Sequence, residues 1–472
     1  MNIFHPQTRR SFLGSSVGLG SVALNLLLQR DAAASEKYRG RAGFPHHQPK
    51  AKRVIWLYMS GGPSHLETFD WKPKLAELDG KPMPESFTRG QPIAQLQGQA
   101  LKVQGPLTKF KQYGKGGTWV SDFLPYAAKM ADDICVFKSM VTDQINHDPA
   151  HTMMNTGTAI SGRPSVGSWV TYGLGSESED LPGFVVLTSF AGRNPQPISQ
   201  RMWNNGFLPG RFQGVEFNSS GDPVYYVGNP KGVSKDQQRD LVDAVRELDQ
   251  HRNETLHNPE VDTRIQQYEM AFRMQASVPE LMDISKEPKE ALELYGAKPG
   301  PGAPGFASNC LLARRLAERG TRFIQLYHRD WDHHGELTKF MDICCKATDR
   351  ATWALLTDLK RRGLLEDTLV VWGGEFGRTP MSQSKGGPGR DHHIKGFSTW
   401  MAGGGVKGGI SYGETDELGY NAVENKVHVR DLHATMLHQL GIDHSRFTVK
   451  YQGLDMKLTG VEPARVVKEV LV

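Results

Sequence analysis

The sequence predicts an α/β protein built on a mostly parallel β-sheet with helices on both faces. Short apolar runs bounded by glycine, such as residues 53–59 and 368–372, are typical of buried strands in a parallel sheet. In the second half of the 472-residue chain a helical pattern precedes such a run twice, at 307–327 and at 349–372. Helices and strands that alternate at this spacing form a parallel sheet covered on both faces.

The first 34 residues are typical of a twin-arginine export signal. An arginine pair, Arg9 and Arg10, precedes a weakly apolar stretch at 15–28, which is too short and too polar to span a bilayer. Alanines at 32–34 supply the small residues that a signal peptidase requires. We therefore expect an exported protein, in the periplasm or outside the cell.

After this leader, residues 35–52 predict a polar linker, and 53–472 predict a single domain with a helical insertion around 235–300. Changes of hydrophobic period and glycine stops give the elements in chain order. In the first half of the chain we expect a strand at 53–59, loops with short elements at 72–117, a helix at 119–131, a strand at 134–137 and a loop that continues as a helix at 147–157. We then expect irregular structure with strands at most at 187–233 and charged helices at 235–274. The last part predicts a helix at 307–319 stopped by Gly320, a strand at 322–327, a helix at 349–363, a strand at 368–372, and a helix that begins at Val429 and ends at Gly441.

Composition excludes several classes of protein. The net charge is +5, with 56 basic and 51 acidic residues spread through the chain, so no basic stripe favours nucleic acid as a partner. Four cysteines are too few and too awkwardly spaced for a disulfide framework or a zinc knuckle, and Cys344 and Cys345 fit a packed helix. Beyond the leader no apolar run is long enough for a stable membrane span, and the oligomeric state stays open.

Carboxylates and imidazoles follow the predicted strands at the point where each strand ends. The candidate metal ligands are His65, Asp332, His334, Glu375, Asp391 and His392. In a parallel sheet the carboxyl ends of strands gather the functional residues, and such a set suits a divalent ion: zinc, manganese or calcium. Taken singly, each residue could be a helix cap or a solvated loop residue. Together, four loops with the same chemistry favour a metal centre.

Four motifs carry a resemblance to a known family: residues 56–73, 331–334, 374–380 and 389–392. Over almost the whole chain the sequence resembles the domain-of-unknown-function family 1501, a twin-arginine-exported family abundant in planctomycetes. Its members are often described as sulfatase-like and are placed in the alkaline-phosphatase-like superfamily of metal-dependent hydrolases. The resemblance implies a three-layer α/β/α sandwich with a metal site at the strand ends.

The same resemblance implies ligand roles for individual residues. Asp332 and His334 match the earlier aspartate and histidine ligands, although Asp330 with His334 fits the wider spacing of the superfamily equally well. Glu375 replaces the aspartate of an Asp-His-Gly loop, whose histidine is here a phenylalanine. His392 matches the late histidine ligand.

The nucleophile departs from the superfamily pattern. In the comparable stretch, residues 146–157, the position of the nucleophile falls on His147, from which no formylglycine can form. Thr152 is a substitute nucleophile, while His147 and His151 are candidates for an extra ligand or a general base. The third catalytic candidate, beside His147 and Thr152, is Arg378. The alternative for His147 is a loop residue bonded to the backbone.

Two functions remain from the sequence. One is a metal-dependent hydrolase of a sulfate or phosphate ester, on a small molecule or a polysaccharide. The other is a non-catalytic exported binding protein that keeps the fold without the chemistry. Twin-arginine export suits proteins that fold before they cross the membrane, often with a cofactor already inserted, so the leader and the predicted metal site support each other.

Overall fold

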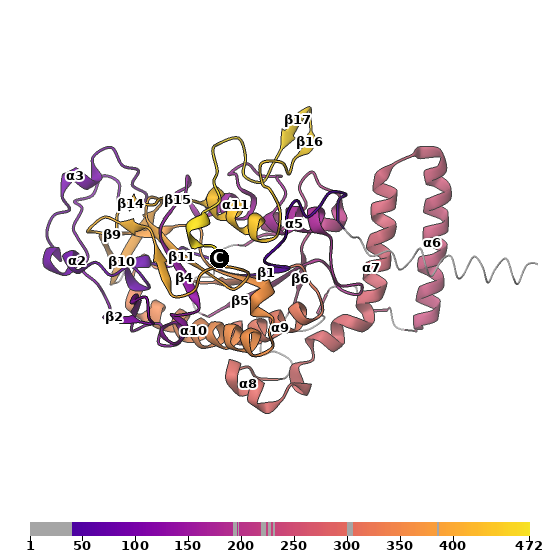
Figure 1. Ribbon diagram of the computed structural model, residues 1–472, viewed down its shortest axis with the longest axis horizontal. Helices are drawn as coiled ribbons and strands as arrows, with labels where there is room; N and C mark the ends of the chain where they lie inside the picture. Colours follow the sequence, from indigo (N-terminus) through magenta and orange to yellow (C-terminus); the bar gives the residue numbers. More distant parts are fainter. Residues whose placement is uncertain are drawn as a thin grey trace, which may run out of the picture. The chain divides into compact units, whose positions relative to one another are not determined.

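A nine-stranded β-sheet lies at the centre of the computed structural model (Figure 1). The structure describes residues 40–472 apart from 192–195, 197, 219–222, 225–227, 230–231, 300–304 and 385–386. The chain divides after Arg39, and the fold given below is that of residues 40–472. The predicted leader, residues 1–34, lies outside the described residues.

The sheet is mostly parallel, as predicted. Its strand order is β12-β4-β11-β8-β1-β7-β5-β6, with β15 paired to β4. The bounds are β1 Arg53–Met59, β4 Ile134–Val141, β5 Phe184–Phe190, β6 Val215–Phe217, β7 Phe323–Arg329, β8 Thr368–Gly373, β11 Phe397–Ala402, β12 Ile410–Tyr412 and β15 Val427–His428. Among these described strands, β11 alone runs antiparallel to its neighbours, β4 and β8.

Helices cover both faces of the sheet, which confirms three layers (Figure 1). Ile55 and Leu57 of β1 share a hydrophobic core with α9 and α10. The alternate residues Trp56 and Tyr58 point the other way, to rings on α11 and α4. The helices are α2 Pro73–Leu78, α3 Glu85–Thr88, α4 His147–Thr156, α5 Val166–Leu174, α6 Lys235–Leu256, α7 Pro259–Met282, α8 Lys289–Tyr295, α9 Phe306–Glu318, α10 Leu337–Arg361 and α11 Val429–Gln439.

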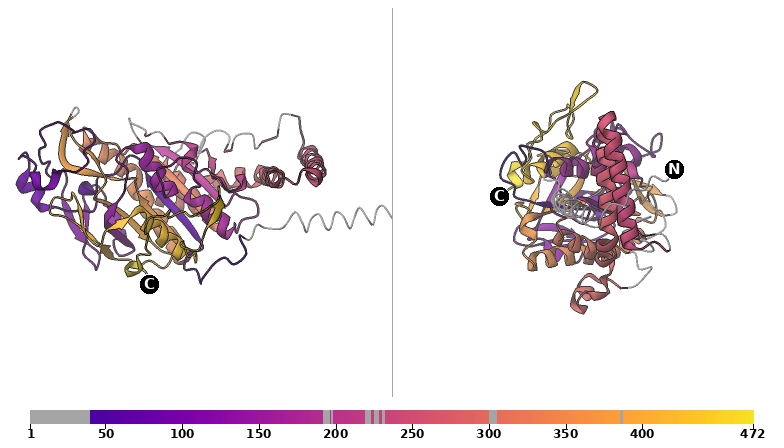
Figure 2. Two further views of the ribbon diagram at one scale, coloured as in Figure 1. Left: turned by 90° about the horizontal axis from the view of Figure 1, so that it is seen from above. Right: turned by 90° about the vertical axis from the view of Figure 1, so that its right-hand side faces the viewer.

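The charged segment expected to be helical forms α6 and α7, which lie side by side (Figure 2). Glu269 of α7 joins them, because its carboxylate lies 3.0 Å from Arg239 and 3.2 Å from Arg246 of α6. No helix in the described part of the chain is long and apolar enough to cross a bilayer. The four cysteines are buried and unpaired, as packing residues are.

The helix predicted over 119–131 is wrong. Residues Thr118–Ser121 form β3, which pairs with β2, Phe110–Tyr113, and a short 3-10 helix follows at Ala127–Met130. Pro125 lies between the two, and a proline inside a helix removes a hydrogen bond and clashes with the preceding turn. The pattern of apolar residues resembled a helix, but this proline prevents one.

The start of α4 also differs from the prediction of a loop. The helix begins at His147 itself, with Pro149 in its first turn, where the missing N–H of proline costs nothing. Helix α10 likewise starts twelve residues before the predicted position of 349, at Leu337. Four small hairpins complete the fold: β2–β3, β9 Gly377–Ser384 with β10 Pro388–His393, β13 Glu414–Thr415 with β14 Ala422–Glu424, and β16 Val449–Tyr451 with β17 Leu454–Met456.

Candidate metal centre

The site forms where three neighbouring parallel strands end. Strand β1 pairs in parallel with β7 on one side and β8 on the other, so their carboxyl ends meet at one edge. The loop after β7 carries Asp332 and His334, and the loop after β8 carries Glu375. Strand β10 adds His392, and the first residue of α4 adds His147.

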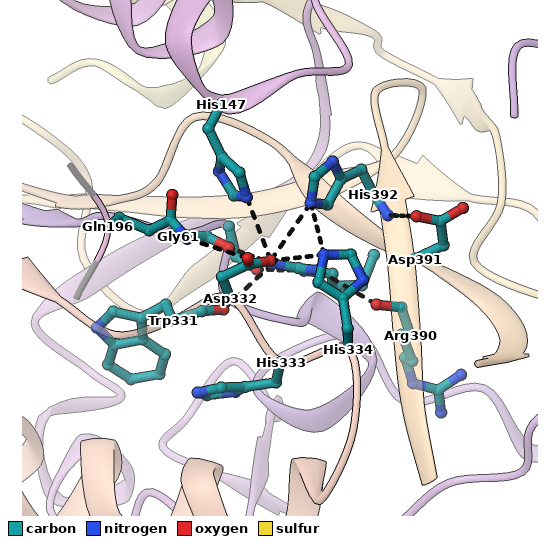
Figure 3. Close-up of polar contacts among 12 residues, drawn as sticks. Gly61, His147, Gln196, Trp331, Asp332, His333, His334, Arg390, Asp391 and His392 are labelled. Atoms are coloured by element: carbon teal, nitrogen blue, oxygen red, sulfur yellow. Dashed lines mark hydrogen bonds and ion pairs between the residues drawn. The ribbon is translucent and has the colours of Figure 1, made fainter. Parts of the chain in front are cut away.

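Three imidazoles converge on a single carboxylate oxygen (Figure 3). Oδ1 of Asp332 lies 3.2 Å from Nε2 of His147, 2.9 Å from Nε2 of His334 and 3.3 Å from Nε2 of His392. The Nε2 atoms of His334 and His392 are 3.0 Å apart. These four residues form a group whose ligand atoms all lie within 4.8 Å of one another.

The other ring nitrogen of each histidine faces a hydrogen-bond acceptor. Nδ1 of His147 lies 2.7 Å from Oε1 of Glu375, and Nδ1 of His334 lies 2.5 Å from Oε1 of Gln383. Nδ1 of His392 lies 2.9 Å from the carbonyl oxygen of Ile145. A neutral imidazole carries one N–H, and these partners place it on Nδ1. In the neutral form of each histidine the Nε2 lone pair is therefore directed at Asp332, although the carboxylates of Asp332 and Glu375 outweigh burial and raise the pKa of His147.

Four donor atoms that meet in this way can hold a metal ion between them. The two Nε2 atoms of His334 and His392 cannot both carry a proton, because their N–H groups would then point at each other across 3.0 Å. Nε2 of His147 is buried without a hydrogen-bond partner in the described structure. Tetrahedral zinc with bonds of about 2.0–2.2 Å keeps its ligands roughly 3.3–3.6 Å apart. The observed separations of 2.9–3.3 Å come close, so the residues fit a divalent ion.

Burial and charge prepare these groups to bind a metal. Burial lowers the pKa of His392 to about 4, so its imidazole is neutral at pH 7. Burial alone would raise the pKa of Asp332, but the Arg378 guanidinium and the hydrogen bonds of the three imidazoles together outweigh burial and hold that pKa well below its ordinary value. Both residues therefore present lone pairs at neutral pH.

Arg378, a predicted catalytic candidate, lies behind Asp332 as a buried clamp. Its Nη2 donates to Oδ1 of Asp332 at 2.7 Å, and its Nε donates to the carbonyl of Gly62 at 2.9 Å. It also donates to the carbonyl of Trp331 at 3.3 Å. Gln196 holds the second oxygen of Asp332 at 3.0 Å. This geometry gives Arg378 a positioning role.

Glu375 stands outside the four-residue group as the carboxylate partner of His147. It is fully buried and accepts the backbone N–H of Gly61 at 3.0 Å. Burial raises its pKa, but the neighbouring His151 and His147 bring that pKa down to about 2. His147, His151 and Glu375 form a second group of possible ligands. Because Nδ1 of His147 donates to Glu375, the carboxylate orients a ligand from outside the shell.

Three predicted site residues lie apart from the centre. His65 bonds through Nε2 to the carbonyl of Gly419 at 2.8 Å, and Asp391 accepts the N–H of Leu96 at 2.8 Å; neither belongs to a ligand group. The hydroxyl of Thr152 donates to the carbonyl of Asp148 at 2.9 Å, one turn back along α4. Five helical positions rotate Thr152 about 140° away from His147, so the structure gives no support for a nucleophile there.

Sequence reasoning missed the residues that hold the ligands in place. Gln383, Gln196 and the carbonyl of Ile145 contact ligand side chains, but they belong to none of the motifs described above. Gln383 lies near the turn of the β9–β10 hairpin, opposite Gly389. Only the hairpin register brings it to His334, and no spacing rule could have found it.

Solved structures similar to this chain come from several enzymes. The PsFucS1 sulfatase from Pseudoalteromonas sp. is 12% identical, with a TM-score of 0.33, covering 90% of this chain and 71% of that one. A variant of the alkaline phosphatase TAB5 with magnesium bound is 11% identical, with a TM-score of 0.32 and coverage of 83% and 99%. The lipoteichoic acid synthase LtaP from Listeria monocytogenes is 9% identical, with a TM-score of 0.34 and coverage of 92% and 80%.

No curated protein matches the chain. One protein-family model, however, matches it. The model of the family named "Protein of unknown function (DUF1501)" matches residues 51–471, which include every residue of the metal centre. The chain therefore belongs to this family.

Proposed function

We propose that this protein is an exported metal-dependent hydrolase of an anionic ester, a sulfate or a phosphate, on a small molecule or a polysaccharide. The observation that carries the proposal is the convergence of three Nε2 lone pairs on Oδ1 of Asp332. Three nitrogen donors favour zinc or manganese over calcium, which takes oxygen ligands. A bound ion of this kind supplies Lewis acidity toward an ester oxygen and acidifies a bound water.

Exposure of the ligands supports a reactive rather than a purely structural centre. The side chains of His147, His334 and Asp332 are 15%, 12% and 10% exposed, whereas that of Glu375 is fully buried. The four-residue group therefore has partial contact with water through these three side chains, and this is the route that we propose for an ester. The buried side holds the groups that orient the ligands, Glu375 and Arg378.

One observation favours a second function, a binding protein without turnover. The position that resembles the superfamily's nucleophile is His147, and the hydroxyl of the nearby Thr152 is bonded to its own helix. A chain without a side-chain nucleophile is a hydrolase only if water attacks. A protein that holds the metal and an anionic ligand without reaction would keep the same four residues.

Metal analysis of the purified full-length chain separates these functions. We expect about one zinc or manganese ion per chain in the wild type, and its loss in His392→Ala. The matched control is His251→Ala, because His251 is an exposed histidine on α6 outside both ligand groups. A wild type without metal would contradict the centre itself.

Turnover is tested on the metal-loaded protein with chromogenic aryl sulfate and aryl phosphate esters. Hydrolysis of either ester that is lost in His392→Ala and kept in His251→Ala supports the hydrolase. Bound metal without turnover of either ester, together with binding of the free anion, supports the binding protein instead.

Export is the part of the proposal that rests on residues 1–34 alone. The Arg9 and Arg10 pair motivates it. We expect that Arg9→Lys with Arg10→Lys keeps the protein in the cytoplasm of a host with a twin-arginine pathway, as cell fractionation would show. Equal secretion of the double variant and the wild type would contradict this route.

A further inference from the structure

Two glutamine side chains contact the same imidazole, that of His334, on its opposite nitrogens. Oε1 of Gln383 lies 2.5 Å from Nδ1, and Nε2 of Gln95 lies 3.1 Å from Nε2. The two amides also bond each other, since Nε2 of Gln383 donates to Oε1 of Gln95 at 3.2 Å. The three side chains thus form a closed ring of hydrogen bonds beside the metal centre.

Gln383 fixes the form of His334 that binds a metal. Its Oε1 only accepts, so the single N–H of the neutral imidazole is held on Nδ1 and the lone pair is left on Nε2. Gln383 is buried on β9, and the register of the hairpin holds it opposite Gly389. It therefore restrains both the tautomer and the direction of the ring, as outer partners of metal ligands do.

Gln95 acts on the same ring in the opposite sense. Its N–H group points at the Nε2 lone pair of His334, which is the lone pair directed at Asp332. An N–H donor and a cation cannot share one lone pair. Gln95 is exposed, and it precedes Leu96, whose backbone N–H is tied to Asp391 at 2.8 Å. A metal that binds His334 has to displace this amide from the ring.

We propose that Gln383 is a positioning residue that strengthens metal binding at His334, and that Gln95 is a competing partner that weakens it. This inference rests on the proposed metal centre. It assigns opposite effects to two residues of the same type that touch the same side chain. A general loss of packing around His334 would change both in the same direction.

The experiment compares zinc affinity in two full-length variants, Gln383→Met and Gln95→Met. Methionine keeps the length of the side chain and removes its hydrogen bonds. Affinity is measured by competition with a chromophoric chelator at pH 7.5. Because Gln383→Met loses the outer partner of His334, we expect its zinc affinity to be about 10- to 100-fold weaker than that of the wild type. Because Gln95→Met loses the competing hydrogen bond, we expect its zinc affinity to be roughly two- to tenfold tighter than that of the wild type.

A third variant, Gln383→Glu, keeps an acceptor for Nδ1 and is expected to restore affinity to the wild-type range. Urea unfolding of the three variants, after a chelator has removed the metal, shows whether a change in zinc affinity is caused by a loss of stability. Zinc affinity of Gln383→Met equal to that of the wild type overturns the proposal, and so does weaker binding in Gln95→Met. A wild type that binds no zinc removes the metal centre itself, which is a different result.

Discussion

The close approach of two loops places Asp332, and Gly61→Ala tests it. Gly61 follows β1 in a backbone conformation with φ +124°, and a Cβ atom there would lie 2.5 Å from the backbone N of Asp332 and 2.6 Å from the carbonyl carbon of Trp331. Real Cβ atoms essentially never come this close to a backbone atom. The two loops fit together only because residue 61 has no side chain.

The size of the effect follows from these distances. Ordinary contact begins at 3.4 Å, so the backbone of Asp332 has to retreat by 0.9 Å from its present 2.5 Å. Metal sites hold their ligands within about 0.2 Å of ideal distances, so zinc affinity is expected to fall by at least tenfold although no ligand has changed. Backbone strain of about 1–3 kcal/mol and overpacking of about 1–3 kcal/mol lower the free energy of unfolding together by about 2–6 kcal/mol.

Gly453→Ala is the matched control. Gly453 also has a left-handed backbone, with φ +83°, but a Cβ atom there meets nothing within 4 Å. It carries the strain without the clash and lies outside the centre. Zinc affinity is measured by chelator competition, and the free energy of unfolding by urea titration of the metal-free proteins. The reasoning is refuted if Gly61→Ala keeps wild-type zinc affinity, or loses no more stability than Gly453→Ala.

Two buried groups away from the centre are expected to give stability opposite dependences on pH. Burial raises the pKa of Asp349 from its ordinary 3.8 to about 7, despite the backbone N–H groups of Tyr126 and Ala127. Relative to the Asp349→Asn variant, the free energy of unfolding of the wild type should therefore fall by about 4 kcal/mol as pH rises from 4 to 7. Burial lowers the pKa of His433 from 6.5 to about 4; relative to His433→Gln, stability should fall by about 3 kcal/mol as pH drops from 6.5 to 4. Urea titrations across pH check both, and a pH-independent difference between wild type and variant would contradict either.

The parts of the fold that the sequence predicts well are those determined locally. The runs at 53–59 and 368–372 became β1 and β8 because short, nearly continuous apolar runs bounded by glycine fit a strand that is covered on both faces. The order of the strands is a different matter. Strand β4, for example, lies between β12 and β11, far from β1, and this pairing depends on contacts distant in the sequence. No local pattern encodes it.

The candidate site divides along the same line. Asp332 and His334 were expected at the centre because they directly follow a strand, and the structure brings them together with His392. The same rule also selected His65, whose imidazole turns instead to the carbonyl of Gly419. Following a strand places a residue at the correct edge of the sheet. The direction of its side chain depends on neighbours that the rule does not consider.

His147 links the missing nucleophile to the metal centre. It occupies the position that resembles the superfamily's nucleophile, yet its Nε2 lies 3.2 Å from Oδ1 of Asp332 and its Nδ1 lies 2.7 Å from Glu375. The same side chain that removes the hydroxyl or thiol thus adds a ligand with its own outer carboxylate. At this centre neither His147 nor Thr152 offers an ester a free hydroxyl or thiol. If water is the attacking group, no covalent intermediate should accumulate on the chain when turnover is quenched.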